Sequence, residues 1–252
     1  RLFGLSNQEG NHGEDVKEYY YYLDSTPTHS YFKALYKYPQ AEFPYRALRD
    51  GNRARTRTMQ EFELMDTGVF HEDRYFDIFV EYAKADVNDI LIRITAINRG
   101  PEKAALHLIP TVWFRNTWSW GRDTSKPSLE RGGESSIQLN VRSLGHYELW
   151  LEDSPKLLFT ENVSNTEKLW RYTSSQGFYK DAFHNCIIHG DTGATNIRET
   201  GTKACGWYPM ELGPGEQKTI RLRLLEQGSA AVDFDAIFSQ RITEADEFYT
   251  LL

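Results

Sequence analysis

The stretch Phe76-Asp77-Ile78-Phe79-Val80-Glu81-Tyr82 places apolar or aromatic side chains at every second position. A period of two is typical of a β-strand with one buried face. Residues 90–97 continue the pattern as a second strand, and Asn98-Arg99-Gly100-Pro101 is a turn by its chemistry. We expect residues 105–114 to return along the second strand as its partner.

The same pattern extends outward from this pair. Glu61 to Asp66 alternates, and further runs are typical of strands separated by turns rich in glycine and proline. These runs are residues 135–142, 146–151, 156–160, 205–212 and 218–225. Many strands with few helices favour an all-β fold, so we expect an antiparallel super-β-sandwich with short helices.

Helical spacing is confined to a few segments. Residues 30–49 are expected to form short helices, and residues 165–185 are expected to include another. From Phe234 to Leu252 the apolar residues step by three or four, which predicts an amphipathic helix broken near Thr243. This pattern predicts a sandwich over residues 1–232 and a linker helix over residues 233–252. The alternative is a terminal helix that packs on its own sheet.

Charge and composition narrow the classes of partner. The 252 residues carry a net charge of −7, which argues against nucleic acid as the main partner. No apolar run is long enough to span a bilayer, and we expect neither a membrane partner nor a secretory leader. Two cysteines are too few for a disulfide scaffold, which favours reduced thiols in the cytoplasm. The chain begins with Arg1, so we expect it to be part of something larger.

Candidate polar residues gather near the start of the chain, in a segment that mixes acids, an amide, an imidazole and an amine. They are Asn11, His12, Glu14, Asp15, Lys17 and Glu18. Their spacing matches no zinc or EF-hand pattern, so no metal is expected. Sequence alone cannot place two of these carboxylates across a sugar, as glycoside hydrolysis requires. A structural or domain-contact loop is the favoured interpretation.

Motifs for nucleophilic catalysis and for cofactors are missing. The chain has no Gly-x-Ser-x-Gly elbow, phosphate-binding loop or dinucleotide fingerprint, so no cofactor is expected. His184 and His189 flank Cys186. In a β-rich segment such a group is typical of packing, with the cysteine in a core strand or packed turn.

A second candidate segment is rich in tryptophan and follows a predicted strand. Its residues are Trp113, Arg115, Asn116, Trp118 and Trp120. Indole rings offer apolar faces, and the polar groups can bond hydroxyls, so the segment suits a sugar or a protein partner. The alternative is that the tryptophans belong to the core, and the sequence leaves both interpretations open.

Three blocks of sequence carry a likeness to a known family. The opening block, residues 1–31, resembles that of bacterial proteins similar to mannosyl-oligosaccharide glucosidase. Residues 64–77 and 113–120 resemble later blocks of the same proteins. The chain thus resembles the N-terminal β-sandwich domain of glycoside hydrolase family 63, and the likeness spans most of its length.

The resemblance implies a function for the sandwich within a larger enzyme. In this family an N-terminal super-β-sandwich precedes a barrel of six helical hairpins, which holds the acid and base of an inverting hydrolysis. No catalytic residue therefore transfers to this chain, which alone is expected to be inactive. The expected partner is the helical-barrel domain of the same polypeptide, and carbohydrate stays open as a second partner. The alternatives are a free-standing carbohydrate-binding module and an interaction domain.

Overall fold

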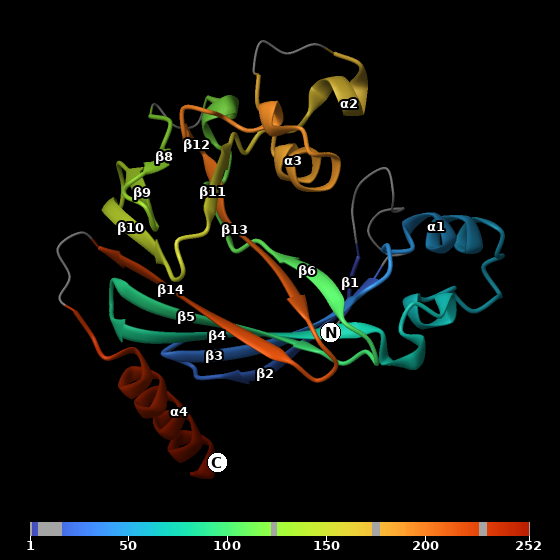
Figure 1. Cartoon of the computed structure of the whole chain (residues 1–252), viewed down its shortest axis with the longest axis horizontal. Coiled ribbons are helices and arrows are strands. Elements are labelled where there is room, and N and C mark those ends of the chain that lie inside the picture. Colours follow the sequence, from blue (N-terminus) through green and yellow to red (C-terminus); the bar gives the residue numbers. More distant parts are fainter. Residues whose placement is uncertain (1, 5–16, 122–124, 173–176, 227–230, 252) are drawn as a thin grey trace.

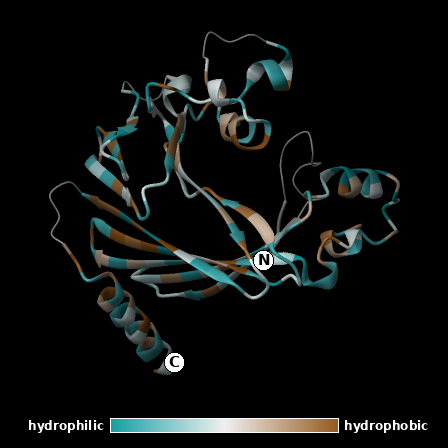
Figure 2. Ribbon diagram, in the orientation of Figure 1, coloured by the Kyte–Doolittle hydropathy of each residue, from teal (hydrophilic) through white to brown (hydrophobic). Residues whose placement is uncertain are grey.

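The alternation around residue 80 produces the central strands β4 (Tyr75–Asp86) and β5 (Asp89–Asn98), which pair antiparallel across a tight turn. Figure 1 shows the computed structural model of the protein, which describes residues 2–4, 17–121, 125–172, 177–226 and 231–251. Apolar and polar bands alternate along the strands in Figure 2, as a sheet with one buried face requires.

The larger sheet contains ten of the described strands, in the order β1-β2-β3-β4-β5-β14-β10-β9-β8-β12. Every neighbouring pair in it is antiparallel. Besides β4 and β5 the strands are β1 (Leu2–Gly4), β2 (Lys17–Ser25), β3 (Tyr31–Pro39), β8 (Ser128–Arg131), β9 (Ser136–Val141), β10 (Gly145–Leu151), β12 (Thr200–Gly201) and β14 (Gln217–Glu226).

The smaller sheet is built around one long strand, β13 (Lys203–Leu212). Along its length β13 pairs antiparallel with β6 (Ala104–Leu108), β7 (Thr111–Trp113) and β11 (Lys156–Thr160). The two sheets bury one core between them, to which Phe76 and Ile94 contribute from the larger sheet and Phe159 and Leu212 from the smaller. The predicted antiparallel sandwich is therefore confirmed.

Helices are short except at the end of the chain. The α-helices are α1 (Tyr45–Arg53), α2 (Thr166–Trp170), α3 (Ala182–His189) and α4 (Phe234–Thr250), and the single-turn helices are η1 (Leu64–Thr67), η2 (His71–Asp73), η3 (Trp118–Trp120) and η4 (Thr192–Ala194). Figure 1 shows α2 and α3 above the sandwich, α1 to one side and α4 below the larger sheet.

The helical prediction for residues 30–49 is wrong in its first half, which forms β3. Phe32 and Tyr36 are four positions apart, a spacing that puts two residues on one side of a helix and also on one face of a strand. Aromatic residues favour the pleated sheet, and pairing with β2 and β4 on both sides stabilises the extended form. Helix begins only at Tyr45.

Two strand predictions also need correction. Residues 61–66 do not form a strand, because η1 begins within them. The Glu63 backbone N–H donates to Asp66 Oδ2 at 2.8 Å, and this hydrogen bond caps η1. Residues 105–114 are extended, but they pair with β13 rather than with β5. They cannot pair with β5, because both of its edges are already occupied by β4 and β14. Pro110, which has no N–H to donate, separates β6 from β7.

The final helix is continuous, so the predicted break near Thr243 is wrong. Asp233 caps the first turn, since its side chain accepts from the Ala236 N–H at 3.0 Å. The Thr243 hydroxyl donates to the Ser239 carbonyl inside the helix and caps nothing. The helix buries Phe238 against its own sheet, as the alternative interpretation expected.

Candidate functional site

The tryptophan segment continues directly from β7, whose last residue, Trp113, lies opposite Lys203 of β13. The next residue no longer belongs to the strand, although the Phe114 N–H still donates to the Thr202 carbonyl at 3.0 Å. From the other side, Asn162 Nδ2 donates to the Phe114 carbonyl at 2.8 Å. The segment therefore leaves the sheet at Phe114, whose backbone N–H and carbonyl are both hydrogen-bonded.

The anchor at Thr202 depends on the glycine before it. Thr202 is fully buried, its N–H donates to the Thr160 carbonyl, and its hydroxyl donates to Glu161 at 2.7 Å. A Cβ at Gly201 would lie 2.2 Å from the Thr160 carbonyl oxygen, closer than two such atoms approach. Only glycine fits there, so β12 can cross closely beside β11 and hold the anchor in place.

Asn116 organises the turn that follows. Its Oδ1 accepts from the Ser119 N–H at 3.2 Å and from the Ser119 hydroxyl at 2.8 Å, which fixes the start of η3. Gly121 ends η3 with a φ of +67°, a left-handed conformation that favours glycine. The Arg115 guanidinium lies 5.9 Å from the centre of the Trp120 ring, within range of a cation–π contact. The two polar candidates thus position the aromatic ones.

The three tryptophans of this segment have different environments. Trp113 and Trp120 are each 58% exposed, whereas Trp118 is half-buried. The indole Nε1 of Trp118 is buried and has no hydrogen-bond partner among the described residues. Two of the rings therefore lie at the surface, and the third carries a donor that is costly to leave unpaired.

Two further aromatic side chains at this end were missed from the sequence. Trp170, the last residue of α2, and Tyr172, just after it, are both well exposed. Figure 1 places α2 and the green 114–121 segment at the same end of the sandwich, above β11 and β12. We call the set Trp113, Trp118, Trp120, Trp170 and Tyr172 the aromatic end. For Trp170 and Tyr172, the signal available in the sequence was the presence of large aromatic residues in an irregular stretch.

The other predicted segment is described only in part. Asn11, His12, Glu14 and Asp15 lie outside the described residues. The backbones of Lys17 and Glu18 open β2 and lie opposite Gly4 and Phe3 of β1, at the edge of the larger sheet. The aromatic end lies beyond the smaller sheet, so the structure does not bring the start of β2 and the tryptophan segment together (Figure 1).

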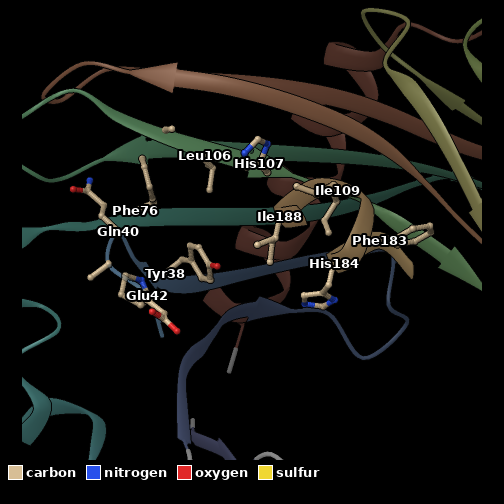
Figure 3. Close-up of a pocket in the computed structure, with 14 residues that line it drawn as sticks. Tyr38, Gln40, Glu42, Phe76, Leu106, His107, Ile109, Phe183, His184 and Ile188 are labelled. Carbon is tan, nitrogen blue, oxygen red and sulfur yellow. The ribbon is translucent and has the colours of Figure 1, made fainter. Parts of the chain in front are cut away.

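A cavity of ≈ 330 Å³ opens between the end of β3, the β6 strand and α3 (Figure 3). Phe76, Leu106 and Ile188 form apolar walls, and His107 and His184 add imidazoles. The Trp207 Nε1–H donates to His107 Nδ1 at 3.0 Å, so a neutral His107 carries its proton on Nε2.

Two basic groups near this cavity have lowered pKa values. Desolvation by neighbouring groups, together with the positive charges of Lys203 and Lys168, lowers the pKa of His184, although its side chain is exposed at the surface. Burial is also the largest influence on Lys203 and lowers the pKa of its amine. His184 is therefore uncharged at neutral pH.

Of the histidine and cysteine cluster, Cys186 has a packing role, whereas His184 and His189 are exposed. Cys186 lies in a helix, not in the strand or turn that was expected, and it packs with Cys205, Leu158 and Phe183 in a small core. Both thiols are free and buried, and burial raises the pKa of Cys205 to about 12. A thiol with that pKa is protonated at neutral pH and is a poor nucleophile.

Two further searches concern only the described part of the chain. It contains no group of three histidine, cysteine, aspartate or glutamate side chains arranged to hold a metal ion. It also contains no helix that is both long enough and apolar enough to cross a membrane.

Comparison with known proteins gives one close sequence relative. An uncharacterized protein of Saccharomyces cerevisiae is 39% identical over 298 residues, in an alignment that covers 99% of this chain. The chain spans only 27% of the length of that protein. No protein-family model matches the chain.

Solved structures with a similar backbone fold have low sequence identity to this chain and low TM-scores. A polysaccharide lyase aligns over 95% of this chain and 26% of its own, with a TM-score of 0.40 and 13% identity. A galactose mutarotase related enzyme from Lactobacillus acidophilus aligns over 92% of this chain and 80% of its own, with a TM-score of 0.36 and 10% identity. Likenesses of this size assign no function. Neither protein is named as a member of glycoside hydrolase family 63, and that resemblance stays an expectation.

Proposed function

We propose that this chain is a non-catalytic β-sandwich domain of an α-glucosidase-type glycoside hydrolase, which packs against a helical catalytic barrel of the same polypeptide. The aromatic end is the observation that carries the proposal. Residues 1–232 would form the sandwich and residues 233–252 the approach to the barrel. Because both cysteines are free and buried, we place the protein in a reducing compartment, the cytoplasm.

The cost of leaving the aromatic end in water supports a covering partner. Burying one large apolar side chain is worth roughly 1.5–3 kcal/mol. Trp113 and Trp120 forgo most of that in the isolated chain, and the buried Trp118 Nε1 has no partner among the described residues. Arg115 adds a cation beside the rings, and tryptophan with arginine is the composition enriched at the energetic centre of interfaces.

The length of the yeast relative points the same way. That protein carries the equivalent of nearly this whole chain within 27% of its length, so there the sandwich accompanies a much longer polypeptide. The resemblance implies that the acid and base of hydrolysis lie in the barrel, so we propose no catalytic residue within this chain.

Calorimetric titration tests the proposal, with this chain and the separately produced remainder of its polypeptide as the two components. We expect specific binding, and the double variant Trp113→Ala/Trp120→Ala should weaken it at least about 30-fold, as the loss of a central interface residue does. Trp150→Ala is the matched control, because Trp150 is an exposed tryptophan on β10, away from the aromatic end.

Three results would contradict the proposal. They are equal binding by the double variant and the wild type, the absence of a helical region of several hundred residues from the same open reading frame, and hydrolysis of an α-glucoside by this chain alone.

A free-standing carbohydrate-binding module is the second candidate, because exposed tryptophans beside an arginine also suit sugar rings. In that case Trp113→Ala/Trp120→Ala would abolish retardation of the chain in a gel that contains a neutral α-glucan. The aromatic end would then bind sugar rather than protein.

A further inference from the structure

A row of aromatic rings crosses three neighbouring strands at the side of the larger sheet away from β14. We call the six rings the tyrosine face: Tyr20, Tyr22, Phe32, Tyr36, Tyr38 and Tyr82. The pairing register places them on one side, because Tyr20 lies opposite Tyr36 and Phe32 lies opposite Tyr82. The consecutive tyrosines at positions 19–22 are thus split by the pleat between two faces.

The rings form an unbroken chain of contacts. In order along the row, the ring centres are 5.9 Å apart for Tyr38–Tyr36, 6.3 Å for Tyr36–Tyr20, 5.3 Å for Tyr20–Tyr22, 5.5 Å for Tyr22–Phe32 and 6.0 Å for Phe32–Tyr82. From Phe32 to Tyr38 the strand alone spans about 20 Å at 3.3 Å per residue. A surface of this length can hold several sugar rings.

The tyrosine face belongs to the inner side of the sheet. Ile78 and Val80, which share this side of β4, pack in the core beneath the smaller sheet. Cover is incomplete over β2, β3 and β4, because Tyr22 is 50% exposed and Tyr38 and Tyr82 are also exposed. The row therefore adjoins the buried core, and several of its rings are exposed to solvent.

This stretch of the inner side carries no charge. Every inner position from Tyr20 to Tyr22, from Phe32 to Tyr38 and from Phe76 to Tyr82 holds an uncharged side chain, whereas Lys33, Lys37, Asp77 and Glu81 occupy the outer side. By the same register the inner charged positions of these strands, Glu18 and Lys84, lie beyond the ends of the row. Burial, and for Tyr20 also the neighbouring phenols, raises the pKa of Tyr20 and Tyr82. These two phenols therefore stay neutral at physiological pH.

The cavity under α3 lies at one end of the row. Tyr38 belongs to both, and Figure 3 shows its ring pointing from β3 toward Ile188 on α3. His184, with its lowered pKa, faces the same opening as a neutral imidazole. The cavity thus adds imidazole groups at the end of the aromatic row, and Glu42 in its lining adds a carboxylate but no positive charge.

We propose that the tyrosine face and the adjoining cavity bind a neutral oligosaccharide chain. The aromatic ring faces match the apolar faces of sugar rings, and phenol and imidazole groups suit a ligand rich in hydroxyls. A net charge of −7 disfavours an anionic polysaccharide. A peptide that binds by backbone pairing needs a sheet edge, whereas this row crosses a sheet face. This site is separate from the aromatic end and does not depend on the proposed docking.

Gel retardation in neutral polysaccharides tests the proposal, with maltoheptaose, cello-oligosaccharides and xylo-oligosaccharides as calorimetric ligands and polygalacturonate as the anionic probe. The wild-type chain should bind at least one neutral glycan and ignore polygalacturonate. Tyr22→Ala and Tyr82→Ala should each weaken binding by roughly three- to tenfold, the loss expected for one stacked ring.

Tyr21 supplies the matched control. It lies in the same strand as Tyr22 and is 39% exposed, but it points to the opposite side of the sheet. Tyr21→Ala should leave glycan binding unchanged, and so should Trp113→Ala/Trp120→Ala. If the tryptophan variant alone abolished binding, the sugar site would be the aromatic end and this proposal would fail while the binding-module alternative gained.

A measurement on the wild-type chain removes any dependence on how the variants fold. Iodination followed by peptide mapping should modify Tyr22 and Tyr38, and saturating glycan should protect them while Tyr21 stays reactive. The proposal is overturned if these two tyrosines do not react in the free chain, if glycan protects neither of them, or if no neutral glycan binds.

Discussion

The two sides of the sheet formed by β2, β3, β4 and β5 are closed in different ways. On the outer side α4 packs against the strands, and Glu81 accepts two hydrogen bonds from Arg93, each 2.9 Å long, and one of 2.7 Å from the Tyr31 hydroxyl. On the inner side, the rings of the tyrosine face, which lie beyond the smaller sheet, remain partly exposed to solvent. The buried Glu81 carboxylate is tolerated on the outer side because Arg93 and Tyr31 satisfy it, whereas the row of rings on the inner side presents an uncharged surface.

The same two sides also differ in what they leave to a ligand. The outer side is occupied by a segment of the chain itself, with Phe238 held between Phe234 at 5.1 Å and the Arg93 guanidinium at 4.3 Å. The inner side has no such cover from the described residues over Tyr22 and Tyr82, both of which are exposed. Variants on the outer side should therefore change stability, and variants on the inner side should change binding.

The largest expected effect is that of Phe238→Ala. Phe238 is fully buried between α4 and the sheet, so its removal leaves a cavity and should lower the free energy of unfolding by about 3–5 kcal/mol. Urea denaturation followed by circular dichroism measures this. A loss below about 1 kcal/mol would mean that α4 contributes little to the outer side.

Glu81→Gln should cost about 3 kcal/mol at neutral pH, because it leaves Arg93 partly buried without its partner. Burial opposes ionisation of Glu81, but hydrogen bonds from Arg93 and Tyr31 outweigh it and hold the pKa of the carboxyl below its ordinary value.

The sign of that shift sets the pH dependence. A lowered pKa in the folded state stabilises the protein above the unfolded pKa, and the contribution disappears as the pH falls through the folded value. The gap in stability between wild type and Glu81→Gln should therefore be wide at pH 7 and narrow below about pH 4.3. Unfolding curves from pH 7 to pH 3 measure the gap, and a gap independent of pH would contradict the assignment.

Asp233→Ala should have a smaller effect, about 1 kcal/mol, since it removes the capping bond to the Ala236 N–H at the start of α4. Glu247→Ala, an exposed position on the same helix, is the control and should change stability by less than about 0.5 kcal/mol. Thermal unfolding compares the two variants, and equal losses would show that the cap does not hold the helix.

Apart from the Glu247→Ala control, the smallest expected effect on stability is that of Tyr22→Ala, which should cost less than about 1 kcal/mol. Half of the side chain already lies in solvent, and what is lost is part of its edge contacts with Tyr20 and Phe32. A loss as large as that of Phe238→Ala would place Tyr22 in the core and remove the contrast between the two sides.

Much of the fold follows from local pattern. The strands around Phe76–Tyr82 and Ile90–Ile97, and those at 135–142 and 218–225, were predicted from alternation alone, because a half-buried strand needs a period of two whatever covers it. The final helix was likewise predicted from its spacing. The pattern failed at Phe32 and Tyr36, where one spacing fits both a helix and a strand.

The candidate site was predictable only in part. Trp113, Trp118 and Trp120 were identified by residue type and by their place after a strand, but their different burial depends on the anchor at Thr202 and the turn at Asn116. Trp170 and Tyr172 join them only because α2 folds back to the same end of the sandwich.

By itself the sequence determined that the protein is an antiparallel β-sandwich, that it carries a net negative charge, and that three of its tryptophans cluster between residues 113 and 120. Only the tertiary structure decided that β6 crosses to the smaller sheet, that Tyr20 and Tyr22 face inward while Tyr21 faces outward, and that α4 covers the outer side alone. The physical reason is that alternation defines two faces for every strand, whereas the long-range pairing and packing that choose which face is covered involve residues far apart in the chain.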